Sequence, residues 1–143
     1  MLEVLPIQSK IEQEAICARC SVPYNPDWMA YHALTDGLLT GICQFSMSAE
    51  GGFIHSIGLI SEVEDGAEAL SEQARREALF VLGRATLNFI DLCGVHTAFF
   101  KDESFTDELI IRWIGFKKNE DGEWAMDLTD FFSEPCKKTH DPL

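Results

Sequence analysis

The amino-acid sequence predicts an α/β (α+β) domain in which a mixed β-sheet is covered by helices. Three observations support this class. Residues 38–47 alternate in polarity with a period of two, and residues 53–60 are almost wholly apolar, as in adjacent strands. Residues 71–93 have the pattern of a long amphipathic helix. Residues 94–132 read as a strand, a short helix and a hairpin.

The chain is predicted to begin with a strand and a helix. Met1–Gln8 has an apolar, strand-like start, and the capping box Ser9-Lys10-Ile11-Glu12 opens a helix that reaches about Cys20. Pro23 and Pro26 then require a loop. Three apolar residues fall on one stripe of this helix: Ile11, Ala15 and Ala18.

A meander of three strands is predicted next. Met29–Leu34 and Leu38–Met47 flank a tight Asp36-Gly37 turn. The alternation along the second arm predicts a strand buried on one face only. A turn at Glu50-Gly51-Gly52 leads to Phe53–Ile60, which is apolar enough to be covered on both faces. The residues expected to share the buried face of the second arm are Leu39, Gly41, Cys43, Phe45 and Met47.

The second half of the chain is predicted to return to the sheet after a long helix. That helix runs from about Ser71 to Cys93 and ends at Gly94. Val95–Phe100 is a short apolar strand, and Thr106–Ile114 is a short helix that stops at Gly115-Phe116. Residues 119–122 have a turn sequence that predicts a final hairpin. The buried stripe of the long helix is expected to contain Ala74, Ala78, Leu82, Ala85 and Phe89.

Length and charge limit the classes of function. The 143 residues are predicted to form one domain over 1–132 with a C-terminal tail over 133–143. The net charge of −13 argues against nucleic acid and anionic membranes as partners, and fits a cationic partner such as an amine. The start of the chain does not have the pattern of a secretory signal, so we expect a cytoplasmic protein. A homodimer is left open as an assembly.

The order of elements, and the strand, helix, Gly115-Phe116 and hairpin spacing of 94–132, resembles the GNAT superfamily of N-acetyltransferases. The resemblance covers roughly residues 1–132. It implies a GNAT-like mixed, mostly antiparallel central sheet flanked by helices, in which 53–60 pairs in parallel with 95–100. It also implies an acetyltransferase that uses acetyl-coenzyme A (acetyl-CoA) as co-substrate, takes an amine as acceptor and needs no metal.

In that family the fourth strand and the next helix form the cofactor site, which maps here onto 53–60 and the helix that ends at Gly94. The resemblance implies that the backbone of Leu59 and Ile60 holds the thioester carbonyl. The glycine-rich phosphate loop of the family is not present. The residues that would stand in for it are Arg75 and Arg76, which would hold phosphate, and Ala78 and Leu79, whose backbone N–H groups would complete the cradle.

The segment before this helix is acidic. Each close approach of a carboxylate to a phosphate costs on the order of 1 kcal/mol or more at a surface-like dielectric. Acidic residues at a helix start also compensate the helix dipole without any ligand. The carboxylates concerned are Glu62, Glu64, Asp65 and Glu68.

The resemblance implies Glu62, just after the fourth strand, as the base that acts through water. Ser104 occupies the position of a family asparagine near the cofactor sulfur, although Ser-x-x-Asp is also a helix-cap pattern. Ile111 stands where many family members have a proton-donating tyrosine, so the general acid is missing. His55 and His32, both on predicted strands, are further candidate bases or structural residues.

Two alternatives remain open at this point. The chain is either an acetyltransferase or a GNAT-like binding or assembly module that has lost acetyl-CoA binding. Cys17-Ala18-Arg19-Cys20 lacks the second half of a zinc site, and reduced, buried thiols are the simplest reading of it. The aromatic residues of the last third are expected to be packing residues: Trp113, Trp124, Phe131 and Phe132.

Overall fold

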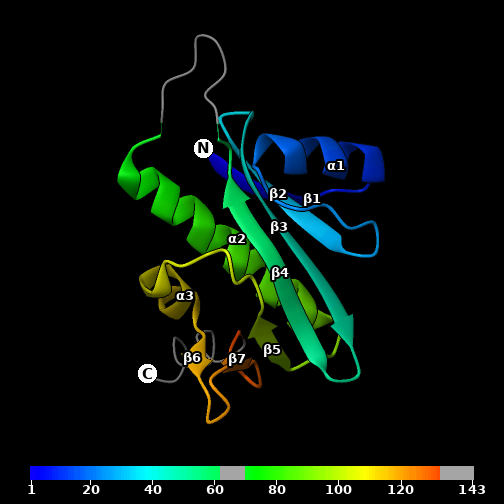
Figure 1. Ribbon diagram of the computed structural model, residues 1–143, viewed down its shortest axis with the longest axis vertical. Helices are drawn as coiled ribbons and strands as arrows, with labels where there is room; N and C mark the ends of the chain where they lie inside the picture. The colour runs from blue at the N-terminus through cyan, green and yellow to red at the C-terminus, as the bar shows by residue number, and fades with distance from the viewer. Residues whose placement is uncertain (62–69, 133–143) are drawn as a thin grey trace, which may run out of the picture.

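The computed structural model describes residues 1–61 and 70–132. These residues form one seven-stranded sheet in the order β1-β2-β3-β4-β5-β7-β6, together with three helices (Figure 1). The neighbours β4 and β5 are parallel, from Gly52 opposite Ala98 to Ile54 opposite Phe100, and the other pairs are antiparallel. The predicted parallel pairing of 53–60 with 95–100 is therefore confirmed.

The elements follow the predicted order with shifted ends. Ser9 and Ser71 cap the first two helices as predicted, because each hydroxyl accepts a backbone N–H three residues on. The bounds are β1 Leu2–Pro6, α1 Lys10–Arg19, β2 Met29–Thr35, β3 Leu38–Ser48, β4 Gly51–Leu59, α2 Glu72–Leu92, β5 Thr97–Phe100, α3 Glu108–Ile114, β6 Lys117–Lys118 and β7 Trp124–Asp127.

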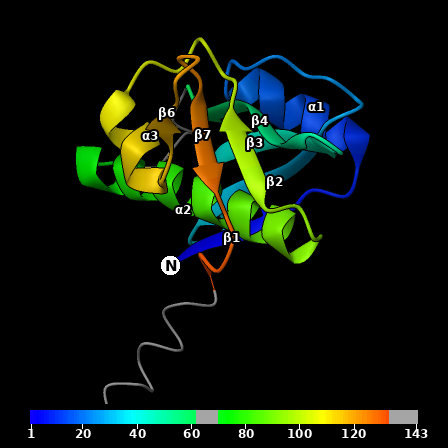
Figure 2. The ribbon, with the colours of Figure 1, turned by 90° about the horizontal axis from the view of Figure 1, so that it is seen from below.

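Helices cover both faces of the sheet. Figure 2 shows α1 on one face and α2 with α3 on the other. The larger core lies under α2 and α3, and a second cluster lies between α1 and the strands β2 and β3. Within the described residues, none of the helices is both long enough and apolar enough to span a bilayer.

The prediction that β3 is buried on one face only was wrong. The strand is buried from Leu39 to Phe45, because α1 covers the face that we expected to meet solvent. Thr40 is also an extra residue opposite Ala33 and Leu34, so it forms a β-bulge. Because of the bulge, Leu39 lies on the face of the sheet that α1 covers, together with Ile42. Phe45, which was predicted to share a face with Leu39, packs in the larger core on the opposite face.

The stripe predicted for α1 was also wrong. Ile11 is 85% exposed, and the buried residues are Gln13, Ile16 and Cys17. This part of the sequence has two short apolar stripes. The stripe that is buried contains Gln13, whose side chain is hydrogen-bonded to Gln44 in the interior. The stripe of α2 was predicted in part, since Ala78 and Leu82 are buried whereas Ala74, Ala85 and Phe89 are half-buried.

Candidate functional site

A gap opens between β4 and β5 at their C-terminal ends. The Lys101 N–H donates to the Ile54 carbonyl at 2.7 Å, and beyond this bond the two chains diverge. Across the gap, the Ile57 N–H donates to Oδ2 of Asp102 at 3.0 Å. A side chain therefore takes the place that a strand neighbour would otherwise fill.

The Ile60 N–H donates to the Thr40 carbonyl at 2.9 Å, on the β3 side. The expectation that it holds a thioester carbonyl was therefore wrong, because β3 already uses this donor. Strand N–H groups alternate in direction, so the Leu59 N–H points away from β3 and toward the gap. The role predicted for Leu59 stays a prediction.

Asp102 is 9% exposed and accepts three hydrogen bonds. Besides Ile57 N–H, its Oδ1 accepts the Ser104 N–H at 3.1 Å and the Ser104 hydroxyl at 2.6 Å. Ser104 is not a helix cap, because Asp107 caps α3 by accepting the Ile110 N–H at 3.3 Å. Sequence analysis missed Asp102, although a polar residue directly after a parallel strand is a recognised signal for a site.

The amino terminus of α2 lies at the same edge of the sheet as the gap, because β4 leads into it (Figure 1). The helix begins at Glu72, so the N–H groups of Ala78 and Leu79 are inside it and bond to carbonyls four residues earlier. Both residues are also buried in the core. Their predicted role in a phosphate cradle was therefore wrong. The N–H groups that lack a carbonyl four residues earlier belong to the first turn of α2, where the Ser71 hydroxyl already accepts that of Ala74.

Arg75 and Arg76, near the start of α2, have different neighbours. Arg75 is exposed, and its side chain does not line the groove described next. Arg76 lies 3.7 Å from the Asp107 carboxylate at the start of α3. Glu62, predicted to be the base, and the other carboxylates of the acidic segment lie outside the described residues.

An open groove of about 830 Å³ runs between α2 and α3. Phe80 and Trp113 stack in it with ring centroids 4.2 Å apart, and Trp113 is 45% exposed. Trp113 thus packs on Phe80 at the edge of the core, and its exposed ring also presents an aromatic surface to the groove. The lining residues are Glu72, Gln73, Arg76, Glu77, Phe80, Val81 and Trp113.

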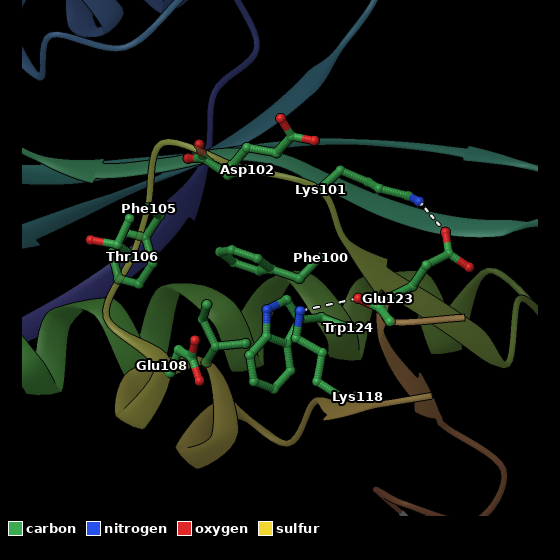
Figure 3. Close-up of a pocket in the computed structure, with 12 residues that line it drawn as sticks. Phe100, Lys101, Asp102, Phe105, Thr106, Glu108, Lys118, Glu123 and Trp124 are labelled. Carbon is green, nitrogen blue, oxygen red and sulfur yellow. Dashed lines mark hydrogen bonds and ion pairs between the residues drawn. The ribbon is translucent and has the colours of Figure 1, made fainter. Parts of the chain in front are cut away.

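A second cavity of about 370 Å³ lies between the end of β5, α3 and the β6–β7 hairpin. Figure 3 shows the Phe100 ring between the Lys101–Glu123 ion pair on one side and Trp124 with Lys118 on the other. The ion pair is 2.6 Å long, and the hydrogen bond from Lys101 holds the pKa of Glu123 below its ordinary value. Ile111 also lines this cavity, so an apolar wall stands at the position of the family tyrosine.

His55 lies on β4 just beyond its last residue paired with β5, as the extra residue of a bulge opposite Gln44 and Phe45. Its imidazole stacks on Trp28 at 4.4 Å between ring centroids, and its Nε2 lies 2.7 Å from the Ser46 hydroxyl. Burial, and then the charge of Lys101, lowers the pKa of His55 from 6.5. Sequence analysis named His55 but missed the partners that hold it.

The remaining candidates have structural surroundings. Nδ1 of His32 lies 2.9 Å from the Leu5 carbonyl of β1, two strands away from the gap. Burial raises the pKa of Cys17 to about 11 and of Cys20 to about 12, so both thiols stay protonated. No three His, Cys, Asp or Glu side chains among residues 1–61 and 70–132 are grouped as metal ligands.

Comparison with known proteins finds similar structures but no protein that is similar in sequence. No protein-family model matches the sequence, and no curated protein matches it either. Solved structures do match. The ribosomal-protein-S18-alanine N-acetyltransferase from Escherichia coli has a TM-score of 0.61 at 11% identity, over 90% of this chain and 94% of its own.

Two further structures agree. The IAA acetyltransferase from Bacillus cereus has a TM-score of 0.62 at 14% identity, over 90% of this chain and 100% of its own. The PaiA N-acetyltransferase from Thermoplasma acidophilum, in complex with coenzyme A, has a TM-score of 0.56 at 8% identity, over 89% and 99% of the two chains. The chain therefore has the GNAT fold, with the mixed, mostly antiparallel sheet that the resemblance implied.

Proposed function

We propose that this chain, whose fold is that of the GNAT N-acetyltransferases, is an acetyl-CoA-dependent N-acetyltransferase that acts on a small or peptidic amine. The observation that carries the proposal is the gap between β4 and β5. The Leu59 N–H is directed toward this gap by strand alternation, and the gap lies at the same edge of the sheet as the start of α2. Acetyl-CoA requires a hydrogen-bond donor for its thioester carbonyl, a helix start for its pyrophosphate and an aromatic surface for its adenine.

The residues present fit coenzyme A in three respects. The first turn of α2 offers N–H groups to the pyrophosphate. Arg76 adds a positive charge beside it, and Arg75 adds a more exposed one. The stacked pair Phe80–Trp113 offers an aromatic surface to the adenine. Glu72 and Glu77 also line the groove and weaken the attraction for phosphate.

The proposed reaction is a direct transfer. The amine nitrogen attacks the thioester carbonyl, whose developing oxyanion receives the Leu59 N–H. The carbon–sulfur bond then breaks with its electrons on sulfur, and the amine proton passes to a base. Glu62 is the base implied by the family resemblance, and His55 is the candidate among the described residues. Because Ile111 has no proton to give, the thiolate leaves unassisted or takes its proton from water.

An amine acceptor fits the electrostatics of the cavity between β5, α3 and the hairpin. Four carboxylates and two lysines line it, so an ammonium group is favoured over an anion. Phe100, Phe105 and Trp124 add aromatic walls for an alkyl part. These features support a small or peptidic amine as the acceptor.

The test is a thermal-shift titration with acetyl-CoA and with coenzyme A at low salt. A ligand that binds only the folded state at a hundredfold excess over its Kd stabilises it by about 2.7 kcal/mol. We expect Tm to rise with either ligand. Release of free thiol in the presence of a panel of amines then tests turnover. A flat Tm up to millimolar cofactor overturns the proposal.

One observation favours a second candidate, a binding or assembly module of the same fold. The Asp102 carboxylate already occupies the Ile57 N–H, a donor that would otherwise face the gap. A negative charge at that place also opposes formation of a thiolate nearby. The module predicts no response to either cofactor, so the same titration separates the two functions.

A further inference from the structure

Two glutamine side chains are buried side by side between α1 and β3. Gln13 is 1% exposed and Gln44 is 0% exposed. The Gln13 Nε2 donates to the Gln44 Oε1 at 2.9 Å. A buried amide without partners costs about 1–3 kcal/mol, so a pair of them must be well bonded to be tolerated.

Two further hydrogen bonds of this pair hold the loop between α1 and β2. The Gln44 Nε2 donates to the Pro23 carbonyl at 2.6 Å, and the Gln13 Nε2 also donates to the Trp28 carbonyl at 3.2 Å. The Lys10 ammonium reaches the same Trp28 carbonyl at 2.5 Å. Both ends of residues 23–28 are thereby tied to the interior.

The loop ends at Trp28, whose indole covers the imidazole of His55. The two rings are 4.4 Å apart at their centroids and only 4° from parallel. The Phe53 ring lies at 6.2 Å from the imidazole, between ring centroids. The imidazole therefore has two aromatic neighbours, and its Nε2 is 2.7 Å from the Ser46 hydroxyl.

We infer that Gln13, Gln44 and Trp28 are positioning residues that hold the imidazole of His55 as the base for amine acetylation. The inference rests on the proposed function and deepens it, because it selects His55 over Glu62. When the amine nitrogen bonds to the acetyl carbon, its proton moves through bridging water to Nδ1 of His55, because His55 does not line the cavity proposed for the amine and stands four residues before Leu59 on β4. The Nε2–H stays on the Ser46 oxygen. The electrons of the broken carbon–sulfur bond remain on sulfur.

The location and charge state of His55 agree with this role. It stands where β4 leaves β5, at the mouth of the gap. The charged group that acts on it is Lys101, which follows β5 and is paired with Glu123 beside β7. Burial and this positive charge lower the pKa of His55 below 6.5, so the imidazole is neutral at pH 7 and able to accept a proton.

The first experiment tests His55 itself by thiol release under saturating acetyl-CoA. His55→Gln should lower kcat by at least about 10²-fold, the usual contribution of a general base. The Tm rise on addition of coenzyme A should match that of the wild-type protein. An unchanged kcat overturns the assignment and returns the role to Glu62. If the wild-type protein shows no cofactor response, the proposed function fails, and the next experiment still decides the positioning claim.

The second experiment measures the pKa of His55 by NMR titration of its ring proton in four variants. Trp28→Leu and Gln44→Leu should both raise it toward the ordinary value of about 6.5. Trp28→Phe keeps an aromatic cover and should retain the wild-type value. Gln8→Leu, an exposed glutamine before α1, is the matched control.

If the protein is active, the acid limb of the pH profile of kcat/KM should shift in each variant by the same amount as the pKa of His55 measured by NMR. A merely structural role would lower Tm without moving this limb. If Trp28→Leu is folded and leaves both the pKa and the limb at wild-type values, the positioning role is wrong. Trp28 is half-buried in a loop, so this variant remains informative even if Gln44→Leu does not fold.

Discussion

The carboxylate of Asp102 accepts the backbone N–H of Ile57 across the gap between β4 and β5. The two residues are 45 positions apart in the chain. A buried N–H without a partner is costly, and β5 has already diverged at this point. Asp102 therefore lets the gap exist without an unsatisfied donor on its wall.

Replacing Asp102 should separate its hydrogen bonds from its charge. Asp102→Ala leaves the Ile57 N–H without an acceptor, and we expect a loss of about 1–3 kcal/mol in the free energy of unfolding. Asp102→Asn keeps a carbonyl oxygen for the same donor and should lose less. Urea denaturation at pH 7 measures both. Equal losses in the two variants would contradict the bridging role.

Arg76→Ala should weaken coenzyme A binding by about tenfold or more, the equivalent of at least 1.4 kcal/mol. The reason is that Arg76 lines the groove between α2 and α3, whereas Arg75 does not. Arg75→Ala should weaken binding by less, and the double variant should resemble Arg76→Ala. Isothermal titration calorimetry at low salt gives the three values. An affinity that is unchanged in the double variant clears both arginines.

Gly51→Ala should destabilise the protein more than Gly122→Ala. Gly51 has a φ of +147°, and a Cβ there would lie 2.9 Å from the Thr97 carbonyl oxygen. Gly122 has a φ of +79° with nothing within 4 Å of the added atom. Its variant should lose about 1–2 kcal/mol from backbone strain alone. Comparable urea midpoints for the two variants would show that the close approach to β5 is not important.

The pH dependence of stability should contain a contribution from His55. Its pKa is lowered in the folded state, so the unfolded chain binds the proton first as the pH falls below about 6.5. The contribution is complete above that pH and is lost as the pH drops through the folded pKa. His55→Asn should therefore show a smaller fall in unfolding free energy as the pH is lowered from about 6.5. An identical slope in both proteins would mean that the native pKa is not lowered.

The cysteines should differ in reactivity toward iodoacetamide in the native state. Cys93 is exposed, whereas Cys17 and Cys20 are buried with raised pKa values of about 11 and 12. Thiolate is the reactive form, so Cys93 should be alkylated well before the CxxC pair. Peptide mapping by mass spectrometry follows each site. Early modification of Cys17 would contradict the burial and the raised pKa of this thiol.

Local patterns were enough for much of the fold. The capping residues Ser9 and Ser71 start the helices as predicted, because capping is a hydrogen bond within three residues. The apolar run of β4 and its parallel pairing with β5 were also predicted. The half-buried reading of β3 failed, since burial of its second face depends on α1 and on the bulge at Thr40.

The sequence by itself determined the order of the elements and the caps of the first two helices, because these depend on short-range periodicity, turn residues and hydrogen bonds within three residues. Only the tertiary structure decided which donors the gap still offers. Thr40 takes the Ile60 N–H and Asp102 takes the Ile57 N–H. It also brought Trp28 and Ser46 to His55. These contacts join segments far apart in the chain, and their geometry is set by packing of the whole sheet rather than by any local preference.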